Sequence, residues 1–289
     1  MINRAGKGEP VLSQPHYFSF VEQTLHYFDR PHEAVPAGPL DCAAAWRGAD
    51  MAPLQELAYT LSASEIGEVE AALAAAIASG KPLGELTTAH FPLPTLAGRM
   101  DEWRQVLQQG LGFVVVRGVP VQNWNPAQCE CFFWCFGLHL GRPGEQNPEG
   151  DLLGHVTDLR EAVEPDSIRL YRTAANIDYH CDAADVVGLL CINKAKSGGH
   201  SRIASSVAVF NELLHRRPEL VPRLFEPFAL DIRDKAVNAA GSTLPIPPCR
   251  YAQHQLRTFY HADYFRSAAR HDDVPPLSEL ERDLLDTYE

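Results

Sequence analysis

Two side chains that can bind the same metal ion stand two positions apart near the middle of the chain. His180 and Asp182 precede an apolar run over residues 186–192. Alternate residues of an extended segment project to the same side of the backbone, so this spacing brings an imidazole and a carboxylate together. Such a pair supplies two of the three ligands of the facial triad that holds non-heme Fe(II) with open positions. The spacing therefore indicates an iron site with one ligand still to be found.

The His-x-Asp spacing alone is a weak signal, because short motifs recur by chance. Two further copies occur in polar surroundings typical of loops or helices: His261/Asp263 and His271/Asp273. Only the first copy is followed by a buried-strand pattern over 186–195 and then by a glycine turn at 198–199. Most such pairs are solvated polar side chains, and it is this context that favours His180 and Asp182 as metal ligands.

The elements around the pair predict an α+β protein. Ser62 and Glu65 form a capping-box pattern ahead of the first long helix, and Ser205 or Ser206 can cap the last one. We expect an irregular arm over 1–50 and a single domain over 51–289. Helices are expected over 63–79, 96–109, 126–138 and 207–216, and strands over 113–117, 155–159, 168–173, 186–195 and 202–204, with a hairpin around 250–260.

Composition limits the partners. The 289 residues carry a net charge of −12, which argues against a nucleic-acid backbone or an anionic membrane as partner. The first ten residues do not resemble a secretory signal, and no apolar run is long enough to span a bilayer. Seven cysteines, an odd number, fit a reducing cytoplasmic location. Three of them share one expected helix and are interpreted as buried thiols: Cys129, Cys131 and Cys135.

A longer stretch carries a family resemblance. Residues 171–220 read YRTAANIDYHCDAADVVGLLCINKAKSGGHSRIASSVAVFNELLHRRPEL, with GFVVVRGVPV at 112–121 and GLHLGRPGEQNPEGDLLGHVTDLR at 137–160 upstream. This text resembles the TauD/TfdA group of Fe(II)/2-oxoglutarate-dependent dioxygenases, in its clavaminate-synthase-like branch, from near Asp50 to Glu289. The resemblance implies a distorted double-stranded β-helix, a cupin-like jelly roll, with helices packed outside it.

The resemblance also implies roles for single residues. His180 and Asp182 would bind Fe(II), and Ser201 would hydrogen-bond the co-substrate 2-oxoglutarate, although a turn serine explains Ser201 equally well. Asn176 matches a position that lines the substrate pocket in relatives, with a turn asparagine as the alternative. Tyr171 is a candidate to face the substrate, with a structural strand tyrosine as the alternative. The implied reaction is oxidation of a C–H bond of a small organic substrate by dioxygen, coupled to decarboxylation of 2-oxoglutarate to succinate. The substrate's identity and the existence of a homo-oligomer stay open.

One part of the family pattern is missing. Family members carry a second iron-binding His well downstream of the first, followed by an Arg that pairs with 2-oxoglutarate. His254, His261 and His271 all fall too early, so we expect the last strands of the jelly roll to be absent. The alternatives are a non-catalytic, shortened paralogue that serves as a binding or interaction scaffold, and a rearranged sheet in which His261 or His254 is the third ligand.

Overall fold

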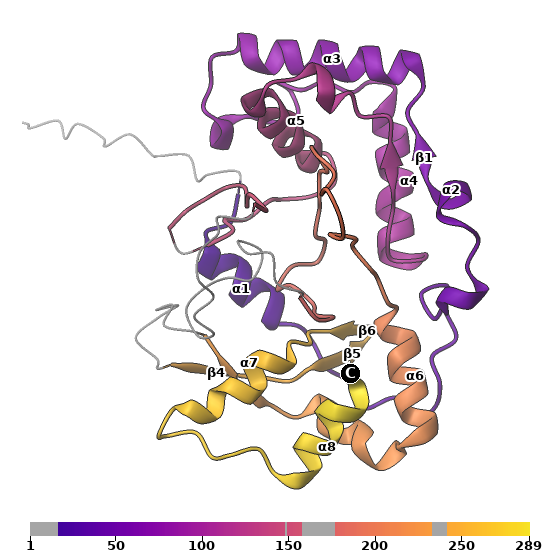
Figure 1. Ribbon diagram of the computed structural model, residues 1–289, viewed down its shortest axis with the longest axis vertical. Coiled ribbons are helices and arrows are strands. Elements are labelled where there is room, and N and C mark those ends of the chain that lie inside the picture. Colours follow the sequence, from indigo (N-terminus) through magenta and orange to yellow (C-terminus); the bar gives the residue numbers. More distant parts are fainter. Residues whose placement is uncertain (1–16, 148, 158–176, 233–241) are drawn as a thin grey trace, which may run out of the picture.

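The computed structural model describes residues 17–147, 149–157, 177–232 and 242–289. It is a mixture of helices and short strands, which agrees with the predicted mixed class (Figure 1). The α-helices are α1 (Phe20–Phe28), α2 (Leu54–Leu57), α3 (Ala63–Ala78), α4 (Leu96–Gln109), α5 (Pro126–Leu138), α6 (Ser206–Arg216), α7 (Ala262–Ser267) and α8 (Glu279–Tyr288). The strands are β1 (Tyr59–Thr60), β2 (Val116–Arg117), β3 (Phe228–Asp231), β4 (Thr243–Ile246), β5 (Cys249–Ala252) and β6 (Gln255–Thr258). Short 3-10 helices include η3 (Val121–Asn123), η5 (Pro218–Phe225) and η6 (Ala268–Arg270).

Helices α3, α4 and α5 build one hydrophobic core, which we call the helical core. Ser62 caps α3 in a reciprocal capping box with Glu65, as predicted, and Asn125 and Pro126 start α5 in the same manner. The faces that these helices turn inward carry buried hydrophobic side chains: Val69, Leu73, Leu96, Met100, Phe132 and Cys135. In Figure 1 this core occupies the upper part of the molecule, with α3 across the top.

A second core, which we call the mixed core, joins α6, η5, α7 and α8 to the strands β3 to β6. Its buried side chains come from every one of these helices: Phe210, Leu220, Leu224, Phe265, Leu284 and Leu285. Phe228 of β3 packs against Phe265 of α7 with ring centroids 5.1 Å apart. The hairpin β5–β6 confirms the strand pair predicted around 250–260, and its turn places Gln253 and His254 at positive φ.

The described residues form three two-stranded sheets, of which β1–β2 is parallel and the other two are antiparallel. In this part of the chain no sheet closes into a barrel. The strands predicted over 186–195 and 202–204 are wrong, and so is the described portion, 155–157, of the one predicted over 155–159. A strand needs a neighbouring strand for its backbone hydrogen bonds. Among the described residues, no strand pairs with these segments. The strand predicted over 168–173 lies outside the described residues.

Two further differences concern the first half of the chain. Residues 17–50, predicted to be irregular, contain helix α1, which starts with a capping box between Ser19 and Glu22. The strand predicted over 113–117 shortens to the two residues of β2. In the residues that the structure describes, no helix is long and apolar enough to cross a bilayer.

Residues 177–205 run between the two cores without regular secondary structure, and we call them the crossing segment (Figure 1). At one end Cys181 and Ala183 pack against the mixed core. Further along, Leu190 packs against the helical core, and a Cβ placed on Gly188 would lie 3.1 Å from the Phe133 ring. The crossing segment therefore holds His180 and Asp182 at the edge of the mixed core.

Candidate metal site

His180 and Asp182 face each other on the crossing segment. The Nε2 atom of His180 lies 3.8 Å from Oδ1 of Asp182, and their side chains are 30% and 58% exposed. Ligand atoms bound at about 2.1 Å and at right angles around one ion lie about 3 Å apart. The observed separation is larger, but the Asp182 carboxylate is more than half exposed and so has room to rotate towards His180. The pair thus has the donor types and the spacing to share one metal ion.

A hydrogen bond fixes the tautomer of His180. Its Nδ1 atom lies 2.8 Å from the backbone carbonyl oxygen of Asp178. A carbonyl oxygen can only accept, so Nδ1 carries a proton; in the neutral imidazole the lone pair is then on Nε2, the atom that faces Asp182. Metal-binding histidines commonly donate their second ring nitrogen to a carbonyl or carboxylate in this way. This hydrogen bond restrains the His180 ring with Nε2 on the side of Asp182.

The residue between the two donors is turned inward. Cys181 donates its backbone N–H to the carbonyl of Tyr260, with N and O 2.8 Å apart. Burial, with a smaller contribution from the charge of Asp182, raises the pKa of the Cys181 thiol. A protonated thiol is a poor ligand, because metals bind the thiolate. Cys181 therefore anchors the backbone, while its two neighbours supply the donor atoms.

A third donor is not supplied by the described residues. Across 17–147, 149–157, 177–232 and 242–289, no group of three His, Cys, Asp or Glu side chains could hold a metal ion. Of the two alternative ligands, His254 is exposed at the tip of the β5–β6 hairpin. His261 does lie beside the pair, with its ring centroid 5.1 Å from that of His180, but the two rings are tilted by 40°. His261 is thus a neighbour of His180 but completes no group of three donors among the described residues.

The other predicted site residues are not joined to this pair. Ser201 lies exposed in the irregular end of the crossing segment, after Gly198 and Gly199, which have positive φ. Within the described residues it makes no hydrogen bond to His180 or Asp182. Tyr171 and Asn176 lie outside the described residues, so their predicted place in a substrate pocket stays a prediction.

The last His-x-Asp copy has a different role. His271 does not face Asp273; its Nε2 atom lies 3.1 Å from Oδ1 of Asp231, a fully buried carboxylate at the end of β3. Asp231 also accepts a hydrogen bond from Ser267 and pairs with Arg270. This network ties η6 to β3 and is a structural feature of the mixed core. Spacing within the motif could not reveal it, because Asp231 is distant in sequence.

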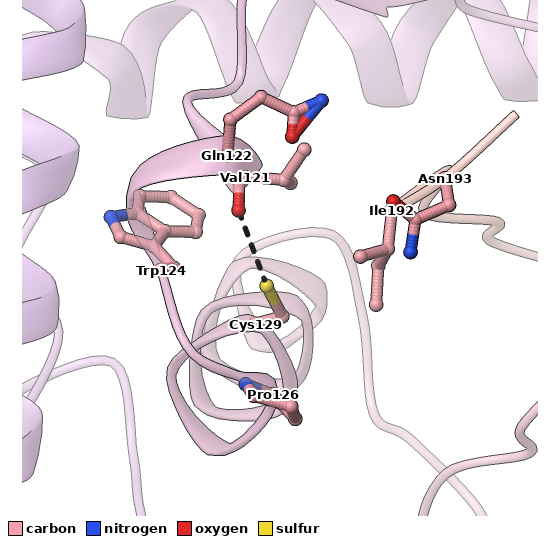
Figure 2. Close-up of a pocket in the computed structure, with 7 residues that line it drawn as sticks. All are labelled: Val121, Gln122, Trp124, Pro126, Cys129, Ile192 and Asn193. Atoms are coloured by element: carbon pink, nitrogen blue, oxygen red, sulfur yellow. Dashed lines mark hydrogen bonds between the residues drawn. The ribbon is translucent and has the colours of Figure 1, made fainter.

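A cavity of about 280 Å³ lies beside the helical core, between η3, the start of α5 and the crossing segment (Figure 2). Trp124, Cys129 and Val121 line one side, with Ile192 and Asn193 opposite, and the Cys129 thiol approaches the Val121 carbonyl at 4.0 Å. A second cavity, of about 220 Å³, is lined by Trp46, Phe113 and Ile203 among others. Neither His180 nor Asp182 lines either cavity.

Known proteins resemble this chain over most of its length. The family described as "Taurine catabolism dioxygenase TauD, TfdA family" matches residues 79–276. FR-33289 synthase of Streptomyces rubellomurinus is 26% identical over 252 residues, which cover 87% of this chain and 74% of that protein. The taurine hydroxylase-like protein SAT17 of Stachybotrys chartarum is 29% identical over 211 residues, which cover 70% of this chain and 54% of that protein. The chain belongs to the TauD/TfdA dioxygenase family, as its sequence predicted.

Proposed function

We propose that this chain forms part of an Fe(II)- and 2-oxoglutarate-dependent oxygenase, with His180 and Asp182 as two of the iron ligands. The observation that carries the proposal is the orientation of the His180 ring. Its Nδ1–H donates a hydrogen bond to the Asp178 carbonyl, and its Nε2 faces the Asp182 carboxylate. A neutral imidazole and a carboxylate with both donor atoms on one side fit a ferrous ion.

Each of these residues has a definable task at the site. His180 would bind through Nε2, and the Asp178 carbonyl would hold the ring in that tautomer. Asp182 would contribute a carboxylate whose negative charge lowers the net positive charge of the metal site. When bound, the iron and 2-oxoglutarate supply the oxidising chemistry, in which dioxygen is consumed, 2-oxoglutarate becomes succinate and carbon dioxide, and a C–H bond of the substrate is oxidised. The third ligand position must be filled by a group that the described residues do not bring to the pair.

Further assignments follow from family membership. Ser201 would hydrogen-bond 2-oxoglutarate, and Tyr171 and Asn176 would line the pocket of a small organic substrate. Hydroxylation is the reaction indicated by the name of one relative, the taurine hydroxylase-like protein. The family also supports a cupin-like jelly roll for a single domain over 51–289 with an arm over 1–50. Seven free thiols support a cytoplasmic location.

The direct test is an anaerobic titration with Fe(II), followed by 2-oxoglutarate, monitored by visible absorbance. Chelation of the iron by 2-oxoglutarate should produce a charge-transfer band in the unsubstituted protein. Asp182→Ala should abolish the band, whereas Asp273→Ala, which changes the same residue type in a motif copy away from the site, should leave it intact. A band of full intensity in Asp182→Ala would exclude Asp182 as a ligand. No band in any of the proteins would instead favour a binding scaffold without iron chemistry.

A further inference from the structure

The His180 segment is fastened to one particular place on the mixed core, namely the junction between β6 and α7. The Cys181 backbone N–H donates a hydrogen bond to the Tyr260 carbonyl, with N and O 2.8 Å apart. His180 precedes Cys181 and His261 follows Tyr260, and the rings of these two histidines lie with centroids 5.1 Å apart. His261 therefore borders the proposed iron site through both a backbone tie and a ring contact.

His261 is itself held firmly. Its ring stacks on that of Tyr264, with centroids 3.8 Å apart and planes inclined by 16°. Its carbonyl accepts the backbone N–H groups of Tyr264 and Phe265 in the first turn of α7. The residues on either side, Tyr260 and Ala262, are 4% and 5% exposed, so the backbone cannot shift without disturbing the core. The imidazole of His261 thus presents a fixed surface to His180.

We propose, as an extension of the proposed function above, that His261 is a positioning residue for the metal ligand His180. The His180 ring is restrained by the hydrogen bond from Nδ1 to Asp178 and by contact with the His261 ring, whose centroid lies 5.1 Å from its own. A ring fixed by a hydrogen bond alone can still rock about that bond, and the second contact limits this motion. Together the two contacts keep Nε2 directed towards Asp182, so that less side-chain entropy is lost when an ion binds.

This role differs from that of a third ligand. A ligand would need a His261 nitrogen to converge with His180 Nε2 and Asp182 Oδ1, and the described residues hold no such group of three donors. A positioning residue needs only its ring surface. The two roles predict different results for phenylalanine, which keeps a ring and loses both nitrogens.

The test measures Co(II) affinity, anaerobically, by competition with a chromophoric chelator, using the full chain. His261→Ala should weaken Co(II) binding by about 10-fold, within the range known for residues that orient a metal ligand. His261→Phe should stay within about 3-fold of the unsubstituted protein, because it restores the ring contact. His254→Asn, at the exposed hairpin tip where asparagine tolerates positive φ, is the matched control and should leave the affinity unchanged. Unaltered affinity in His261→Ala, or a loss in His261→Phe as large as in His261→Ala, would overturn the proposal.

A second measurement needs no metal. In the metal-free protein, the ring protons of His180 should show a ring-current shift from the neighbouring aromatic rings, assigned in the nuclear magnetic resonance spectrum by comparison with His180→Gln. His261→Ala should move these resonances towards their values in an unfolded peptide, and His261→Phe should keep them displaced. If the unsubstituted protein bound no metal, the proposed function would fail, yet these spectra would still report the contact. Unchanged His180 resonances in a folded His261→Ala protein would refute the contact itself.

Discussion

His271 and Asp231 meet at the end of β3, with Nε2 of the imidazole 3.1 Å from Oδ1 of the buried carboxylate. Asp231 is 0% exposed, and it also accepts a hydrogen bond from Ser267 and pairs with Arg270. Asp231→Ala would leave the partly buried Arg270 guanidinium without this carboxylate and would remove the hydrogen bonds of Ser267 and His271. We expect it to lower the free energy of unfolding by about 3 kcal/mol, measured by urea denaturation. Asp273→Ala, an exposed aspartate nearby, should change stability by less than about 0.5 kcal/mol, and equal effects from the two would show that the network contributes nothing.

Metal binding should distinguish the first His-x-Asp copy from the last. His180→Ala removes a proposed ligand, so the Co(II) affinity should fall by at least about 10-fold in the chelator competition. His271→Ala should lower the urea midpoint through Asp231 while leaving the affinity of the folded protein unchanged. A loss of Co(II) binding in His271→Ala at a temperature where it is fully folded would contradict the assignment of the site to the first copy.

The exposed apolar residues of the crossing segment should contribute little to stability, despite their strand-like sequence. Leu189 is 72% exposed, whereas Phe210 of α6 is fully buried in the mixed core. Phe210→Ala should therefore cost about 3 to 5 kcal/mol of unfolding free energy, and Leu189→Ala less than about 0.5 kcal/mol. Both values come from the same urea denaturation series. A large cost for Leu189→Ala would mean that this segment is packed in solution.

The cysteines should divide into two classes of reactivity. All seven are free thiols, of which Cys42 and Cys191 are exposed. Cys249 is buried in the mixed core, and burial raises its pKa to about 12. Because the thiolate is the reactive form, iodoacetamide at neutral pH should label Cys42 and Cys191 in the native protein and Cys249 only after unfolding. Mass spectrometry of tryptic peptides reads out both classes, and early labelling of Cys249 would contradict the buried position.

An ion pair between η5 and α8 should make stability fall in acid. Burial opposes ionisation of Glu281, but the Ser278 backbone N–H and the Arg223 guanidinium outweigh it and lower the Glu281 pKa below 4.5. A lowered pKa means that this stabilisation is complete above 4.5 and disappears as pH falls through the folded-state pKa. Glu281→Gln should thus be less stable than the unsubstituted protein by about 2 kcal/mol at neutral pH, and the difference should shrink as the pH falls below 4.5. A gap independent of pH would argue against the ion pair as its cause.

The helices could be predicted because their signals are local. The start of α3 is indicated by Ser62 with Glu65, and the start of α5 by Asn125 with Pro126, in each case within a single turn. Helix α1 carries the same signal in Ser19 and Glu22, and it was missed because the proline-rich and glycine-rich composition around it indicated an irregular arm. Strands depend on distant partners, so the apolar pattern over 186–195 could not say whether a neighbouring strand would be present.

The site divides in the same way. His180 and Asp182 could be proposed from the sequence because the two side chains are close in sequence and of types that bind metals. The contact with His261 depends on how the end of β6 meets the crossing segment, and no local pattern encodes this meeting. The acidic partner of His271 was hidden for the same reason, since Asp231 lies on a different element.

The way the crossing segment is attached has a consequence for how the protein unfolds. It is attached to two separate cores but has no regular secondary structure of its own, so it can detach in a local opening that leaves both cores folded. Heat or denaturant should then release a bound ion before the global transition. Release of the ion would then accompany a local unfolding step. The midpoint of that release would report the attachment of residues 177–205 to the two cores rather than the unfolding of the whole molecule.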